Sequence, residues 1–200
     1  MGNREALVEG AKACLLEKGY SRTTARDIAT TAGVSLAAIG YHFGSKETLL
    51  NEALRVLLTE EWATEVAGAA KGNHADRAVA GGTREQFVAT WRQIVESLEN
   101  PRMRALWTAQ FEVLSLGATM PELVADLAKM QGEAREGLAY LFGGVGPDAE
   151  PEEVQAIGSL LQAMLLGVVA QSMFDPGTAP TGEELARSLR QLADRISPSA

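Results

Sequence analysis

The chain has 200 residues, of which 46% are hydrophobic and 22% are charged. This composition is typical of a globular protein with a buried core, and it excludes intrinsic disorder as the main state. One cysteine excludes a disulfide framework, and two histidines far apart in sequence do not suggest a zinc site. We therefore expect neither a metal nor a cofactor.

Charge is divided unevenly along the chain, whose net charge is −8. Residues 1–50 hold 6 Lys and Arg against 5 Asp and Glu, a net charge of +1, whereas residues 51–200 hold 12 against 21, a net charge of −9. The excess of negative charge in residues 51–200 repels phosphate over about 8–10 Å at physiological salt. Only residues 1–50 are therefore suited to approach nucleic acid. The asymmetry indicates two functional parts.

The chain has no uninterrupted apolar run of about 18 residues, and the N-terminal segment MGNREALVEG carries charges. The first observation disfavours a membrane-spanning helix, and the second disfavours a secretory signal. We expect a cytoplasmic protein with no membrane partner.

Apolar residues recur at helical spacing along most of the chain, with no alternating strand pattern. The pattern predicts an all-α fold of about nine helices. The first four are expected up to Gly19, from Thr24 to Ala32, from Leu36 to Phe43, and from Ser45 to about Trp62. Later apolar stripes predict helices over residues 87–98, 103–114, 121–141, 151–173 and 182–196, after an Ala- and Gly-rich connection at 66–83 that we expect to be mobile.

Helix ends are marked by residues with a physical reason to stand there. Gly19 is placed to end the first helix. Thr24 is placed to cap the second, with Asp27 three residues on as in a capping box. Ser35 and Ser45 are expected to cap the third and fourth helices.

Residues 24–46, TARDIATTAGVSLAAIGYHFGSK, have the pattern of a helix-turn-helix, with Gly33 at the tight turn. The second helix of this motif has an outward face almost without charge, which is unusual for a solvated helix and fits insertion into the major groove of DNA. That face consists of Leu36, Ala37, Ala38, Gly40 and Tyr41.

The ordered run of Thr-Thr-x-x-Asp-Ile-Ala, Ala-Gly-Val-Ser and Ile-x-Tyr-His-Phe-x-Ser-Lys-Glu-x-Leu-Leu resembles the DNA-binding domain of the TetR family of bacterial transcriptional regulators. The resemblance is best over residues 4–50. It implies a DNA-binding domain at 1–47, a helical ligand-binding and dimerisation domain at 48–200, and a repressor that binds a double-stranded, inverted-repeat operator.

The resemblance also implies roles for individual residues. Thr24 would contact phosphate through its hydroxyl and backbone N–H, Tyr41 and His42 would grip the phosphate backbone, and Lys46 would bind phosphate. Ser35 would cap the recognition helix, while Leu36, Ala37, Ala38 and Gly40 hold the base-contacting positions. Packing of Tyr41 and His42 in the core, or a solvated Lys46, are the alternative interpretations. No outward Arg or Asn is present to read a base strongly, so the operator sequence is not predicted.

By the same resemblance, the second part encloses a pocket for a small-molecule effector. An apolar or aromatic ligand is expected from the candidate lining residues Phe87, Trp91, Met103, Trp107, Gln110 and Phe111. Gln110 is a polar amide on an otherwise apolar face, so it is expected to bond either a neighbouring helix or the ligand.

Residues 154–173 are apolar on more than one side, which exceeds what one buried stripe requires. We expect a homodimer there, with Gly158 and Gly167 permitting close helix approach, although a central core helix would show the same pattern. The candidate interface residues are Ile157, Leu161, Met164, Leu165, Val168 and Leu189.

Two other classes of protein have less support in the sequence. The sequence has no GxxxxGK[ST], GxSxG or HExxH motif, and its adjacent glutamates stand at helix starts, where the helix dipole explains them. We therefore expect no enzyme. A ligand-binding or scaffold protein whose helix-turn-helix no longer binds DNA is the remaining alternative, favoured by Gly40 and the acidic balance.

Overall fold

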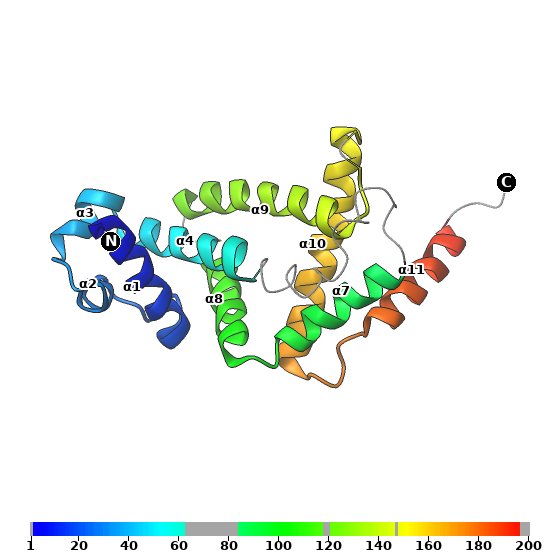
Figure 1. Ribbon diagram of the computed structural model, residues 1–200, viewed down its shortest axis with the longest axis horizontal. Coiled ribbons are helices and arrows are strands. Elements are labelled where there is room, and N and C mark those ends of the chain that lie inside the picture. The colour runs from blue at the N-terminus through cyan, green and yellow to red at the C-terminus, as the bar shows by residue number, and fades with distance from the viewer. Residues whose placement is uncertain (1, 63–83, 118–120, 147, 197–200) are drawn as a thin grey trace. The chain divides into compact units, whose positions relative to one another are not determined.

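The structure is a computed structural model that describes residues 2–62, 84–117, 121–146 and 148–196. Within these ranges it is all helical, with nine α-helices and no strand, as the sequence predicts. The elements in chain order are α1 (Asn3–Lys18), α2 (Ala25–Ala32), α3 (Ala37–Phe43), α4 (Lys46–Val56), the π-helix η1 (Leu57–Trp62), α7 (Arg84–Ser97), α8 (Pro101–Gly117), α9 (Pro121–Phe142), α10 (Pro151–Phe174) and α11 (Gly182–Ile196) (Figure 1). The connection predicted at 66–83 lies outside the described residues.

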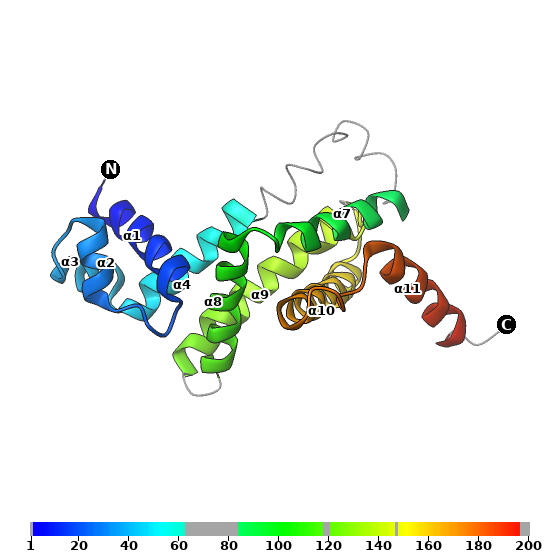
Figure 2. The same ribbon diagram turned by 90° about the horizontal axis from the view of Figure 1, so that it is seen from below.

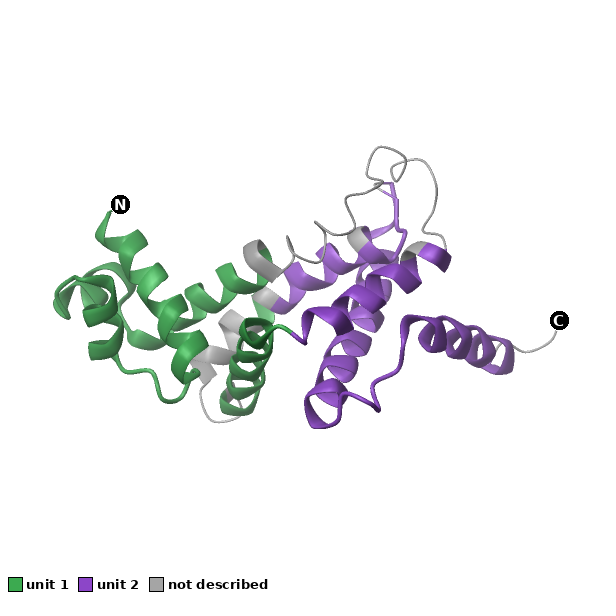
Figure 3. Cartoon of the chain, turned by 60° about the horizontal axis from the view of Figure 1, so that its bottom comes forward, with its two compact units in different colours: residues 1–64, 100–130 green, residues 65–99, 131–200 purple. Residues whose placement is uncertain are grey.

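The chain forms two compact units (Figure 3). Unit 1 comprises Met1–Thr64 and Asn100–Met130, and unit 2 comprises Glu65–Glu99 and Gln131–Ala200. Unit 1 therefore joins the N-terminal helices to α8, which packs against α1 and α4. This division by packing differs from the functional division after residue 47 that the sequence suggests.

The N-terminal part of unit 1 is built around α1, α2 and α3, which lie together in two perpendicular views (Figures 1 and 2). Leu7, Leu15, Ile28, Leu50 and Leu54 are fully buried there and form the core with their neighbours. Burial of each such side chain contributes about 1.5–3 kcal/mol to folding. The N-terminal head, formed by α1, α2 and α3, is therefore a rigid support for the residues on its surface.

The helix ends in unit 1 follow most of the predicted signals. Gly19 ends α1 with a φ of 82°, and Thr24 and Asp27 form the reciprocal capping box of α2. The Ser45 hydroxyl accepts from the Thr48 N–H at the start of α4. The prediction that Ser35 caps α3 is wrong, because the helix begins one residue later, at Ala37, and the Ser35 carbonyl rather than its hydroxyl accepts from the Ala38 N–H.

In unit 2, glycines allow two close helix contacts. A Cβ at Gly158 of α10 would collide with the Arg135 carbonyl of α9. A Cβ at Gly182, the first residue of α11, would lie 2.5 Å from the Val88 carbonyl of α7. Gly158 therefore permits close packing within the chain, whereas a Cβ at Gly167 would meet nothing within 4 Å.

By length and composition alone, α10 is the one helix in the described part of the chain that could cross a membrane, although no membrane span was expected. Core helices can have the same length and composition. Leu161, Leu165 and Val169 of α10 are buried inside the chain, so part of its apolar surface is already covered by protein.

Candidate nucleic-acid interface

The outward face of α3 is exposed, as the helix-turn-helix pattern predicts. Leu36 is 50% exposed and Tyr41 is 86% exposed, which is unusual for large apolar or aromatic side chains. Ala37 and Gly40 are also exposed, and Ala38 is half-buried. The face is thus uncharged, narrow and open to a partner.

Buried contacts on the opposite side hold α3 in place. Ile39 is buried, and Gly33, in the left-handed conformation at φ 67°, ends α2 and turns the chain toward α3.

The α1 and α2 backbones approach closely at Gly10, where a Cβ would lie 3.0 Å from the Ala32 Cβ. Gly10 was not singled out from the sequence, because a glycine inside a helix gives no local sign of which helix it will meet.

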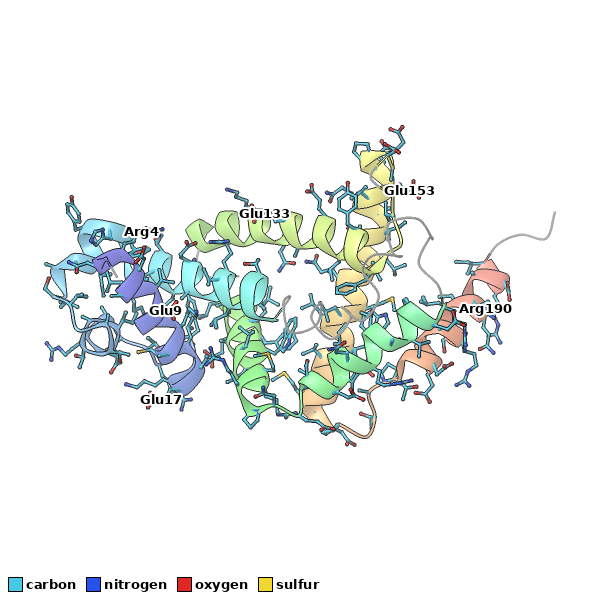
Figure 4. All side chains as sticks on the ribbon, in the orientation of Figure 1. Arg4, Glu9, Glu17, Glu133, Glu153 and Arg190 are labelled. Carbon is cyan, nitrogen blue, oxygen red and sulfur yellow. The ribbon has the colours of Figure 1, made fainter. Side chains whose placement is uncertain are left out.

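Tyr41 and His42 lie at the C-terminal end of α3. Their rings meet edge to face at 4.9 Å between centroids, with His42 half-buried. Next in sequence, Phe43 contacts α1, because the Arg4 guanidinium lies over its ring, 5.1 Å from the centroid (Figure 4 labels Arg4). The arrangement leaves the Tyr41 hydroxyl on an exposed side chain beside the face of α3.

Thr24 is less available to phosphate than the resemblance implies. Its N–H donates to Asp27 Oδ2 at 2.9 Å, and its hydroxyl donates to the same oxygen at 2.6 Å. The Lys18 ammonium, 2.6 Å from Asp27, and the Thr24 bonds together hold the pKa of the Asp27 carboxyl well below its ordinary value. A phosphate at the start of α2 is left the N–H groups of Ala25 and Arg26, which lie in the first turn and lack intrahelical acceptors.

Lys46 begins α4 and is partly buried. Its ammonium donates to the Thr23 carbonyl at 3.1 Å and lies 3.4 Å from the Glu47 carboxylate. Because an ammonium has three donors, a phosphate contact is still possible, but Lys46 also ties α4 to the segment before α2. The Ser35 side chain is exposed and is not used as a cap.

The candidate ligand residues fall into two groups, one in each unit. On α8 of unit 1, Met103, Trp107 and Gln110 are buried and Phe111 is half-buried. Gln110 Oε1 has no hydrogen-bond partner within the described chain, which is costly for a buried carbonyl oxygen.

On α7 of unit 2, the Phe87 and Trp91 rings lie 5.8 Å apart. The buried Trp91 Nε1, and the buried Ser172 hydroxyl of α10, also have no partner within the described chain.

A groove of about 290 Å³ lies between α7 and α11. Its lining is charged, so it differs from the apolar ligand site that the sequence predicts. Its lining residues are Arg84, Glu183, Arg187, Arg190, Gln191 and Asp194.

The candidate interface residues of α10 and α11 differ in exposure. Leu161, Leu165 and Val168 are buried within the chain, whereas Ile157, Met164 and Leu189 are half-buried. Among the described residues of unit 2, the exposed large apolar side chains are Tyr140, Leu160, Phe174, Leu192 and Ile196. The sequence pattern did not single these out as an interface, since helical periodicity alone does not tell which of several apolar stripes another helix covers.

Taken together, the fold and the exposed α3 define a helix-turn-helix protein with a larger helical part. The family model described as "Bacterial regulatory proteins, tetR family" matches residues 7–53, and the one described as "Tetracyclin repressor-like, C-terminal domain" matches residues 82–195. Together the two matches cover the helix-turn-helix and most of the helices that follow it. The chain belongs to the TetR family.

Curated relatives match over part of the chain. The HTH-type transcriptional repressor KstR2 of Mycobacterium tuberculosis is 33% identical over 113 residues, which is 56% of this chain and 44% of that protein. The HTH-type transcriptional repressor AcnR of Corynebacterium efficiens is 29% identical over 119 residues, 57% of this chain and 61% of that protein. The chain thus spans about half the length of these relatives.

Among solved structures, the multidrug binding protein EbrR complexed with imidazole superposes with a TM-score of 0.64, covering 98% of this chain and 90% of that one at 20% identity. The likeness shows a shared fold.

Proposed function

We propose that the chain is a DNA-binding transcriptional regulator that binds an inverted repeat as a homodimer and releases it when a small apolar or aromatic molecule binds. The observation that carries the proposal is the exposed, uncharged face at α3, where Leu36 and Tyr41 are exposed and Ile39 on the opposite side is buried. A major groove about 12 Å wide admits such a helix and offers thymine methyl groups to small apolar side chains.

The distribution of charge supports the same role. Residues 1–50 carry a net charge of +1 in a chain whose net charge is −8. Only this part can approach a polyanion without repulsion, and the acidic remainder disfavours non-specific wrapping of DNA. Contacts to phosphate would set the register, and α3 would select the sequence.

A homodimer is supported by apolar side chains that unit 2 leaves uncovered. Phe174 is 91% exposed and Leu160 is 55% exposed on α10, and Leu192 and Ile196 are exposed on α11. Large apolar side chains exposed to this degree are typical of surfaces that meet another protein. A second copy is the occupant we propose, because reading an inverted repeat requires two heads related by two-fold symmetry.

A ligand response is supported by the buried Gln110, whose Oε1 lacks a partner in the described chain. A bound molecule with an apolar body would contact the aromatic side chains of α8, and a donor on it would satisfy this oxygen. The names of relatives point the same way, since they are repressors and EbrR is described as a multidrug binding protein.

Selection of bound fragments from random double-stranded DNA, at a fixed salt concentration, tests the proposal. The chain should enrich one inverted repeat, and Leu36→Asp, which places a carboxylate at the exposed residue directly before α3, should enrich none while remaining folded. A folded dimer that enriches no sequence would contradict DNA binding and favour a ligand-binding or scaffold protein.

A further inference from the structure

The connection between α1 and α2, residues 19–24, is held by a side chain 91 residues away in sequence. Glu112 of α8 accepts a hydrogen bond from the Ser21 N–H at 2.9 Å and a longer one from the Ser21 hydroxyl at 3.4 Å. Helices α1 and α8 both belong to unit 1 and pack against each other. A carboxylate that accepts a backbone N–H forms one of the stronger hydrogen bonds available to a protein.

Gly19 shows how closely the carboxylate approaches this connection. A Cβ at Gly19 would lie 2.9 Å from Glu112 Oε1, and the residue has a φ of 82°, where a side chain is strained. Glycine therefore serves two purposes here: it ends α1, and it leaves room for the carboxylate of α8.

The same connection is also held by α4. The Tyr20 hydroxyl donates to Asn51 Oδ1 at 2.8 Å, and Lys46 donates to the Thr23 carbonyl at 3.1 Å. Thr23 is itself buried, and its hydroxyl donates to the Gly19 carbonyl at 2.7 Å. A displacement of α8 would thus reach α2 through a short segment that is also hydrogen-bonded to α4.

Glu112 is also two residues from Gln110 on the same helix. Gln110 is buried and Glu112 is half-buried, so one turn of α8 carries both the amide proposed to meet a ligand and the carboxylate that holds the head. A rigid helix transmits a shift at one of these residues to the other.

We propose that Glu112 is a positioning residue, whose carboxylate holds the α1–α2 connection against α8 and fixes the orientation of the reading head. The inference rests on the proposed function and adds to it the residue through which α8 acts on the head. The consequence is a defined distance between the two heads of the dimer, and hence discrimination between operators with different half-site spacings.

Two substitutions distinguish the length of the Glu112 side chain from the charge of its carboxylate. Glu112→Asp keeps the charge but withdraws the carboxylate by one methylene, whereas Glu112→Gln keeps the reach and an acceptor oxygen but removes the charge. Glu17→Asp is the matched control, because Glu17 is an exposed glutamate near the end of α1 (labelled in Figure 4). Each variant is first checked for helicity and for dimerisation.

The measured quantity is the ratio of affinities for the selected inverted repeat and for the same repeat with two base pairs inserted at its centre. Glu112→Asp should lower this ratio roughly tenfold, which corresponds to loss of a hydrogen bond to a charged group. Glu112→Gln should lower the ratio less than Glu112→Asp, because a neutral acceptor that still reaches the Ser21 N–H forms a weaker hydrogen bond, and Glu17→Asp should leave the ratio unchanged. Amide exchange at Ser21 should speed up by a similar factor in Glu112→Asp alone.

Unchanged spacing discrimination in Glu112→Asp would overturn the inference, as would an equal loss in Glu17→Asp. Loss in Glu112→Gln with retention in Glu112→Asp would also overturn it, because long-range charge would then be the cause. If the unaltered chain enriches no repeat, the proposed function fails first and the inference fails with it. If it enriches a repeat and Glu112→Asp behaves normally, only the inference fails.

Discussion

At the scale of single residues, the Tyr41 hydroxyl offers the simplest test of contact with phosphate. Tyr41→Phe removes one oxygen from a side chain that is 86% exposed, so the fold should be unaffected. Loss of one hydrogen bond of about 0.5–1.5 kcal/mol should weaken DNA binding about 2- to 12-fold, equally for all sequences. Fluorescence anisotropy with several DNA fragments measures this.

Tyr140→Phe is the matched control for that change, because Tyr140 is an exposed tyrosine of α9 in unit 2. It should leave the affinity for DNA unchanged. A loss confined to one DNA sequence in Tyr41→Phe would instead assign Tyr41 to base readout.

Asp27 predicts how the stability of the head depends on pH. Its pKa is lowered in the folded chain by the Lys18 ammonium and by the hydrogen bonds from Thr24. A carboxylate whose pKa is lower folded than unfolded adds stability above its unfolded pKa, about 3.9, and this stability is lost as pH falls below that value toward the folded pKa. Urea unfolding between pH 6 and pH 2 should therefore show a loss that is smaller in Asp27→Asn. Identical pH profiles for the two proteins would show that the ion pair adds nothing.

At the scale of helices, two glycines of the helix-turn-helix make opposite predictions. A Cβ at either Gly33 or Gly40 would meet nothing within 4 Å, but only Gly33 has a positive φ, at 67°. Gly40→Ala should stabilise the chain by about 0.5–1 kcal/mol, because alanine is the better helix former. Gly33→Ala should destabilise it by about 1–2 kcal/mol, because the left-handed conformation strains a side chain. Urea unfolding of both variants measures the difference, and changes of the same sign would contradict the assignment of Gly33 to the turn.

The sequence predicted those features of the helices that depend on neighbouring residues. Gly19, Thr24, Asp27 and Ser45 end or cap helices as expected, because capping is decided within about four residues. Ser35 does not, since the chain between α2 and α3 leaves the turn only at Leu36 and the Ser35 carbonyl takes the first N–H.

The candidate nucleic-acid site was predictable to the same extent. The outward phase of α3 follows from the buried position of Ile39, so the exposure of Leu36, Ala37 and Tyr41 was predicted. The contact of Glu112 with Ser21 was not, because nothing local in the sequence pairs residues 91 positions apart. The Asp27 bonds that occupy Thr24 are local and could have been inferred from the capping box.

At the scale of the whole molecule, the proposed dimer depends on the exposed apolar side chains of α10 and α11. Leu160→Asp places a charge in the proposed interface, and desolvating that unpaired charge should weaken the dimer by about 2 kcal/mol or more, roughly 30-fold. Light scattering over a range of concentrations should show monomer where the unaltered chain is dimeric, and DNA affinity should fall with it.

Ala134→Asp, at an exposed position of α9, is the control for the added charge. It should leave both dimerisation and DNA affinity unchanged. A fully dimeric Leu160→Asp would exclude this face of α10 and move the interface elsewhere. The sequence could indicate an interface on α10 but not its face, since Leu161, Leu165 and Val168 share the pattern and are buried within the chain.

The central claim is that the exposed face of α3 reads base pairs, and a change of specificity tests it most directly. Selection from random DNA is repeated with Ala37→Asn, because asparagine forms two hydrogen bonds with adenine in the major groove. Ala134→Asn carries the same change at an exposed position of α9. Ala37→Asn should enrich a repeat altered at the same one or two positions of both half-sites, and Ala134→Asn should enrich the original repeat. An unaltered repeat from a folded Ala37→Asn dimer would contradict the claim.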